Sequence, residues 1–113
     1  MIHYLNLHDN PFQFIKKQLK AIEMRLNDEK RKQIKIGDIL IFTNIVTKET
    51  LSCEVINLYS YPSFEELYKN LDKEKLGYLK DDIADPKDME MYYSKERIIQ
   101  YGVLGIEIKL INK

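Results

Sequence analysis

The spacing of hydrophobic residues changes along the first quarter of the chain, and each change predicts a new element. Alternation over Ile2–Leu7 predicts a short strand. The segment Asp9-Asn10-Pro11 predicts a helix start, because proline fits the first helical turn and Asp9 or Asn10 can cap it. Apolar residues at helical spacing then give this helix its buried face, namely Phe12, Ile15 and Leu19.

A period of two returns in the next segment. Apolar residues at 22, 24 and 26 alternate with Glu23 and Arg25, which predicts a strand with one buried face and places both charged side chains on the same side. A charged loop at 27–33 and a tight turn at 35–38 lead to two more strands, at 39–43 and 51–57. These pieces favour an antiparallel meander.

The second half of the chain is more helical and closes with a strand. Ser63 and Glu66 have the spacing of a capping box, Asp85-Pro86 predicts another helical stretch, and residues 94–101 a further turn. Gly102 interrupts the pattern before a strand at 103–111. We find no linker or repeat, so we expect a single α+β domain over residues 1–113. Its strands, drawn from both ends of the chain, should form a small barrel-like sheet with flanking helices.

Composition narrows the classes of function without selecting one. The chain has 113 residues, with 18 basic and 18 acidic side chains, so its net charge of zero excludes a polybasic, histone-like mode of binding. Its single cysteine, Cys53, excludes an intramolecular disulfide and a cysteine-cluster zinc site. With only two histidines, the chain is also not expected to form a histidine-rich metal centre. We therefore expect no metal and no cofactor.

The sequence also bears on location. No apolar run approaches the roughly 18 to 20 residues that a membrane span needs. The first residues lack the basic and apolar segments of a signal peptide. We therefore expect a cytoplasmic protein that makes no membrane contact.

Charge is unevenly distributed along the chain. Residues 16–35 hold eight basic and three acidic side chains, whereas residues 65–90 hold nine acidic side chains and five lysines. Such a molecule can turn a basic face toward a polyanion and keep an acidic face away from it. The alternative is that both segments are simply solvated surface.

One pattern suggests a family. Residues 20–25 read Lys-x-x-Glu-x-Arg between a predicted helix and strand, and they precede the turn Lys35-Ile36-Gly37-Asp38. With the closing segments at 92–96 and 101–106, this order resembles the ASCH (activating signal cointegrator homology) family of the PUA-like superfamily. The resemblance implies a small PUA-like β-barrel with flanking helices, and a cleft beside residues 20–25 that binds RNA or a nucleotide. Gln18 stands where many relatives carry glycine.

The residue types in this pattern suit a polyanion or a base. Lys20 can reach a phosphate, and Arg25 offers a planar fork for phosphate oxygens or a base edge. Glu23 can accept hydrogen bonds from a base amine or pair with Arg25. Tyrosines can stack on an unpaired base, and the basic loop can attract the backbone. The predicted nucleic-acid-binding residues are Lys20, Glu23, Arg25, Lys30, Arg31, Lys32, Tyr61, Tyr93 and Tyr101. The simpler alternative is a surface ion pair between Glu23 and Arg25, with tyrosines that only pack.

Two other functions remain open from the sequence. One branch of the superfamily consists of small amidohydrolases that act on acetylcytidine and use a Lys-x-x-Thr pair. In this chain Lys20 matches the lysine and Glu23 replaces the threonine, so a hydrolase would need Glu23 as general base and Lys20 as oxyanion stabiliser. The second alternative is a protein-interaction module, whose partner the sequence does not identify.

Overall fold

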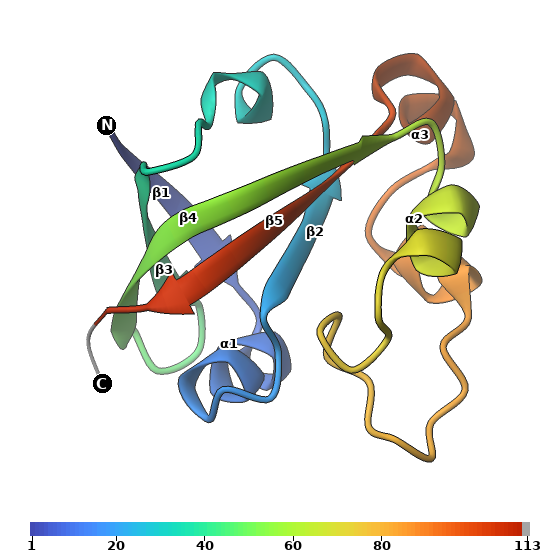
Figure 1. The fold of residues 1–113 in the computed structure, drawn as a ribbon. Coiled ribbons are helices and arrows are strands. Elements are labelled where there is room, and N and C mark those ends of the chain that lie inside the picture. The colour runs from blue at the N-terminus through green and yellow to red at the C-terminus, as the bar shows by residue number, and fades with distance from the viewer. Residues whose placement is uncertain (112–113) are drawn as a thin grey trace.

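Five strands form one curled sheet, and the computed structural model describes residues 1–111 (Figure 1). The strands are β1 (Ile2–Leu7), β2 (Ile22–Leu26), β3 (Ile39–Asn44), β4 (Thr50–Tyr61) and β5 (Val103–Leu110). Their order in the sheet is β1-β3-β4-β5-β2, so β1 and β2 are the two edges of a half-barrel. The expected α+β class with a barrel-like sheet is confirmed.

The strand pairing differs from a simple meander. β3 pairs antiparallel with β4 as expected, but β1 pairs parallel with β3, and β2 pairs antiparallel with β5 at the other end of the sheet. Parallel neighbours need a crossover connection, which the segment between β1 and β3 supplies. The antiparallel-meander prediction was therefore wrong for β2, because its partner lies about 80 residues further along the chain.

Within residues 1–111, three short α-helices and two 3-10 helices accompany the sheet. They are α1 (Asp9–Lys16), α2 (Phe64–Asn70), α3 (Lys95–Tyr101), η1 (Arg31–Gln33) and η2 (Pro86–Met91). Ser63 caps α2 as predicted, since its hydroxyl accepts a hydrogen bond from the Glu66 N–H at 3.2 Å. At α1 the capping position is His8 rather than Asp9 or Asn10. The Asp9 carboxylate instead accepts from the side chains of Gln13 and Asn44.

The apolar core has two parts that share β5. Inside the curl of the sheet, Phe12 of α1 packs with residues of β1, β3, β4 and β5. Between β2 and the helical second half, Ile22 and Met24 pack with Phe64 and other residues of the second cluster. β2 was expected to have one buried face, but both of its faces are buried. Glu23, on the face expected to be exposed, is only 5 % exposed. The alternating pattern identifies the apolar face of β2, but it does not reveal that the other face points into the curl.

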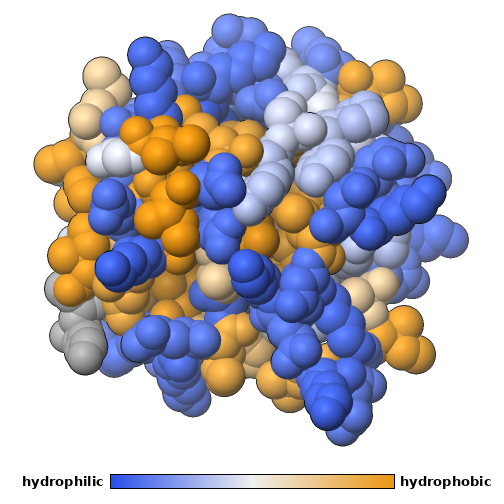
Figure 2. All heavy atoms as spheres, in the orientation of Figure 1, coloured by the Kyte–Doolittle hydropathy of each residue, from blue (hydrophilic) through white to orange (hydrophobic). Residues whose placement is uncertain are grey.

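Exposed apolar side chains occur both on the sheet and in the helical second half, for example Ile2, Ile83 and Ile99. Figure 2 shows hydrophobic residues gathered where β1 and β3 lie, while hydrophilic residues dominate most of the remaining view. The exposed large side chains on β1 and nearby segments include Ile2, Tyr4 and Ile36. Across residues 1–111, no helix is long and apolar enough to cross a membrane.

Candidate functional site

A pocket lies at the open side of the half-barrel and has a volume of about 560 Å³. Its floor comes from β2 and from Lys20, two residues before β2, and one wall comes from the end of β1 and from α1. The other wall comes from the irregular segment 76–93. The side chains that matter below are Asn6, His8, Lys20, Glu23, Arg25, Tyr78, Asp88, Tyr92 and Tyr93.

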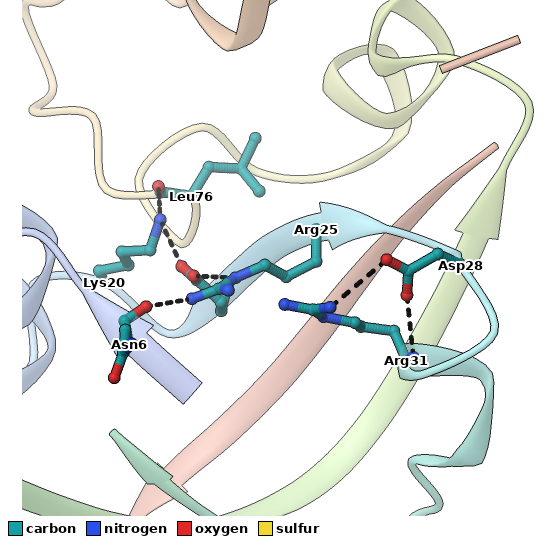
Figure 3. A network of polar contacts seen from close by, with 7 residues as sticks. Asn6, Lys20, Arg25, Asp28, Arg31 and Leu76 are labelled. Atoms are coloured by element: carbon teal, nitrogen blue, oxygen red, sulfur yellow. Dashed lines mark hydrogen bonds and ion pairs between the residues drawn. The ribbon is translucent and has the colours of Figure 1, made fainter. Parts of the chain in front are cut away.

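Glu23 is the centre of the charged floor. One carboxylate oxygen lies 3.3 Å from the Lys20 ammonium, and the other accepts a 2.7 Å hydrogen bond from Nε of Arg25 (Figure 3). Burial on its own would raise the pKa of this carboxyl, but the charges of Arg25 and Lys20 and their hydrogen bonds outweigh burial and lower it. Glu23 is therefore ionised, and both of its oxygens are occupied.

Lys20 is held by the opposite wall as well as by Glu23. Its ammonium donates to the carbonyl oxygen of Leu76 at 3.2 Å, and its side chain is only 9 % exposed. Gly77 follows with a φ of +105°, and a Cβ built there would lie 3.2 Å from Cδ of Lys20. The wall passes so close to Lys20 that glycine is the residue that fits.

The junction before β2 has an unusual backbone. Gln18 adopts a φ of 61°, a left-handed conformation that favours glycine. The N–H groups of Ala21 and Ile22 then donate to the carbonyl oxygen of Lys75, each at 2.8 Å. The loop therefore keeps a backbone shape suited to glycine at Gln18, and it docks against the segment that holds Lys20.

Arg25 spans the opening between the two edge strands. Its Nη2 donates to the carbonyl oxygen of Asn6 on β1 at 2.7 Å, while its Nε binds Glu23 on β2. Burial would lower the pKa of the guanidinium, but the charge of Glu23 reverses that effect and raises it. The side chain thus stays charged, and it ties β1 to β2 where the barrel is open.

Aromatic side chains form much of the remaining wall. The rings of His8 and Tyr92 lie 5.8 Å apart, and those of Tyr92 and Tyr93 lie 6.5 Å apart. Tyr78 donates to Asp88 at 2.8 Å. Burial raises the pKa of the Tyr93 hydroxyl, which therefore remains protonated and can donate a hydrogen bond.

The structure brings together four of the nine residues predicted to bind nucleic acid. Lys20, Glu23, Arg25 and Tyr93 all line the pocket. The other five do not line it: Lys30, Arg31, Lys32, Tyr61 and Tyr101. Arg31 nevertheless acts electrostatically on Tyr93.

The five residues outside the pocket occupy three places. Lys30, Arg31 and Lys32 lie at η1, just after β2. Tyr61 ends β4 and packs against the second apolar cluster. Tyr101 ends α3, where its ring lies 5.9 Å from the guanidinium carbon of Arg97.

The pocket residues that were not predicted from the sequence include His8, Tyr78 and Tyr92. His8 follows β1 and occupies the N-cap position of α1, while Tyr78 and Tyr92 belong to the opposite wall. The neighbouring aromatics Tyr92 and Tyr93 are the one local signal that pointed to this wall. Its position against β2 depends on contacts between residues more than fifty positions apart, which no local pattern reports.

The chemistry of the floor suits binding better than proton transfer. A general base works best with a pKa near the operating pH, whereas Glu23 has a lowered pKa and two cations on its oxygens. Residues 1–111 contain no group of three or more His, Cys, Asp or Glu side chains placed to hold a metal ion. What the floor offers a ligand is fixed positive charge beside aromatic surface.

Comparison with known proteins identifies relatives over the whole chain. A sequence model of the ASCH domain matches residues 5–112. The crystal structure of hypothetical protein PH0355 is 33% identical, with a TM-score of 0.83, and the match covers 98% of this chain and 100% of that one. The solution structure of protein PF0455 from Pyrococcus furiosus is 31% identical with a TM-score of 0.71, and all of both chains are covered. No curated protein matches the chain.

Proposed function

The chain belongs to the ASCH domain family, and on this premise we propose that it binds single-stranded RNA or a nucleotide in the pocket over Lys20, Glu23 and Arg25. PUA-like folds of this kind are often associated with RNA binding. The observation that carries the proposal is a charged floor within aromatic walls, in a pocket whose volume lies in the range of about 300 to 1,000 Å³ typical of ligand sites.

The two kinds of surface serve different parts of such a ligand. Tyr92 is 49 % exposed and lies beside His8, so its ring can accept a stacked base. Lys20 and Arg25 supply positive charge that attracts phosphate. Because their positions are fixed by Glu23, Asn6 and Leu76, the floor is pre-organised before a ligand arrives.

Binding is tested with labelled single-stranded RNA by fluorescence anisotropy at 50 and 200 mM salt. We expect affinity to fall with salt, because phosphate contacts release counterions. Tyr92→Ala should weaken binding by about fivefold or more, the loss expected for one stacked base. Tyr4→Ala removes another exposed tyrosine, on β1 and outside the pocket, and should leave affinity unchanged.

Equal losses in the two tyrosine variants would contradict the pocket as the binding site. An absence of RNA and nucleotide binding by the wild type would contradict the proposed function itself. The hydrolase alternative uses the same pocket and is tested by incubation with acetylcytidine. We expect no release of cytidine, because Glu23 is a weak base.

A further inference from the structure

Two arginines approach each other beside the pocket, one on β2 and one at η1. Figure 3 shows the guanidinium of Arg31 extending toward that of Arg25. Both side chains act electrostatically on the hydroxyl of Tyr93, which lines the pocket. The three groups therefore lie near one another at the rim of the candidate site.

Several hydrogen-bond donors in this region have no acceptor in the described part of the chain. Arg31 uses Nη1 to reach Asp28 at 3.3 Å, while its buried Nε has no partner and Nη2 makes no hydrogen bond. Arg25 uses Nε and Nη2, which leaves Nη1. The protonated Tyr93 hydroxyl adds a further donor. A buried guanidinium N–H without an acceptor is costly, so an arriving oxygen ligand would gain from meeting it.

The cations at this rim outnumber the carboxylates that pair with them. Lys20, Arg25 and Arg31 are paired with the two carboxylates of Glu23 and Asp28, which leaves one positive charge in excess among these five groups. Asp88, on the wall formed by segment 76–93, accepts a hydrogen bond from the neutral Tyr78 hydroxyl and keeps its negative charge. The local excess beside Arg31 suits a phosphodiester, which carries a single negative charge, whereas a terminal phosphate carries about 1.5 to 2 at neutral pH.

We propose that Arg25, Arg31 and Tyr93 bind one backbone phosphodiester of a single-stranded RNA, next to the base that enters the pocket. The inference rests on the RNA-binding function proposed above and adds a defined position on the strand. Arg31 presents Nε and Nη2 along one edge of its fork, the geometry that suits two phosphate oxygens. Tyr93 connects the two sites, because it lines the pocket and its hydroxyl lies within the electrostatic reach of both arginines.

The test places a single neutral methylphosphonate linkage at each position of the RNA in turn. With the wild-type protein, the methylphosphonate at one position should lower affinity about tenfold or more, because it removes the charged acceptor of these hydrogen bonds. With the Arg31→Gln variant, the methylphosphonate at that position should lower affinity no more than one at a neighbouring position. Arg97→Gln removes an arginine on α3, away from the pocket, and should keep the position effect. Circular dichroism confirms that each variant is folded.

A second measurement separates this inference from the proposed function. Dimethyl phosphate, a free phosphodiester, is titrated into ¹⁵N-labelled protein while the Nε–H resonance of Arg31 is followed, with sodium chloride at equal ionic strength as control. A shift specific to dimethyl phosphate supports the subsite even if RNA fails to bind. RNA binding that depends on Tyr92, with neither a position effect nor this shift, overturns the inference and leaves the proposed function standing.

Discussion

Glu23 determines the charge of the pocket floor, because each of its oxygens is bound to a different cation. Glu23 is only 5 % exposed, so water cannot replace these contacts for Glu23 or for its partners. Removing one member of a buried ion pair is strongly destabilising, since it leaves a buried charge uncompensated. Glu23→Gln should therefore lower the free energy of unfolding by about 3 to 5 kcal/mol, measured as a fall in the urea midpoint.

The matched control is Glu54→Gln, on an exposed position of β4. A surface substitution of this kind should change the free energy of unfolding by no more than about 0.5 kcal/mol. Similar urea midpoints for the two variants would show that the ion pairs of Glu23 contribute no more than a surface charge.

The sequence predicted part of this arrangement and missed the rest for a physical reason. The period of two placed Glu23 and Arg25 on one side of a strand, and the family pattern added Lys20. The alternative of a surface ion pair between Glu23 and Arg25 does not hold, because both side chains are largely buried. Alternation reports which face is apolar, whereas the burial of charged groups depends on the partners that the fold brings to them.

At the scale of elements, the junction between α1 and β2 keeps a backbone that its sequence does not favour. Gln18 lies in the left-handed region with a φ of 61°. A side chain there costs about 1 kcal/mol relative to glycine. Gln18→Gly should therefore raise the free energy of unfolding by up to about 1 kcal/mol, measured by urea or thermal unfolding.

Lys17→Gly is the matched control for this prediction. Lys17 is the neighbouring residue and has a φ of −84°, so glycine offers no relief of strain there. It should only add flexibility to the unfolded chain and lower stability by a few tenths of a kcal/mol to about 1 kcal/mol. A loss of stability in both variants would contradict the inferred strain at Gln18.

The contact between segment 76–93 and β2 is tested at Gly77. A Cβ at this position would lie 3.2 Å from Lys20, and the φ of +105° disfavours any side chain. Gly77→Ala should destabilise the protein by about 1 to 2 kcal/mol and also weaken RNA binding, because Lys20 must move. Unfolding midpoints and fluorescence anisotropy measure the two effects separately.

Gly37→Ala distinguishes backbone strain from displacement of Lys20. Gly37 has a similar φ of +94°, but nothing lies within 4 Å of its Cβ position. This variant should lose stability to a similar degree and keep the RNA affinity of the wild type. If Gly77→Ala also keeps that affinity, Lys20 does not contribute to RNA binding through its present position.

At the scale of the whole molecule, the pocket exists because the half-barrel is left open. The edge strands β1 and β2 do not pair with each other, and Arg25 reaches across to Asn6 where a strand pair would otherwise close the barrel. The helical second half then supplies the missing wall. The sequence predicted the elements and most of their order along the chain. The order of the strands in the sheet and the position of the wall depend on contacts between residues distant in the chain.

The charge state of the folded molecule predicts its response to acid. The pKa values of Asp9, Glu23 and Asp38 are all lowered in the fold. For Asp38, hydrogen bonds from His3 and from the Lys35 N–H bring the pKa to about 2. These contacts join the start of β1 to the turn before β3, so they support the parallel strand pair.

A carboxyl with a lowered pKa in the folded state binds protons more readily when the chain is unfolded. Its stabilising effect is complete above the unfolded value, about 3.9 for Asp, and is lost as the pH falls through the folded value. The urea midpoint should therefore be constant near neutral pH and fall between about pH 4 and pH 2.

Asp38→Asn should lower the midpoint at pH 7 and flatten its fall between about pH 4 and pH 2, because asparagine does not titrate. An identical fall in the wild type and in Asp38→Asn would mean that the contacts of Asp38 do not lower its pKa. The acid response would then belong to Asp9, Glu23 and the repulsion among basic side chains that no longer have ionised partners.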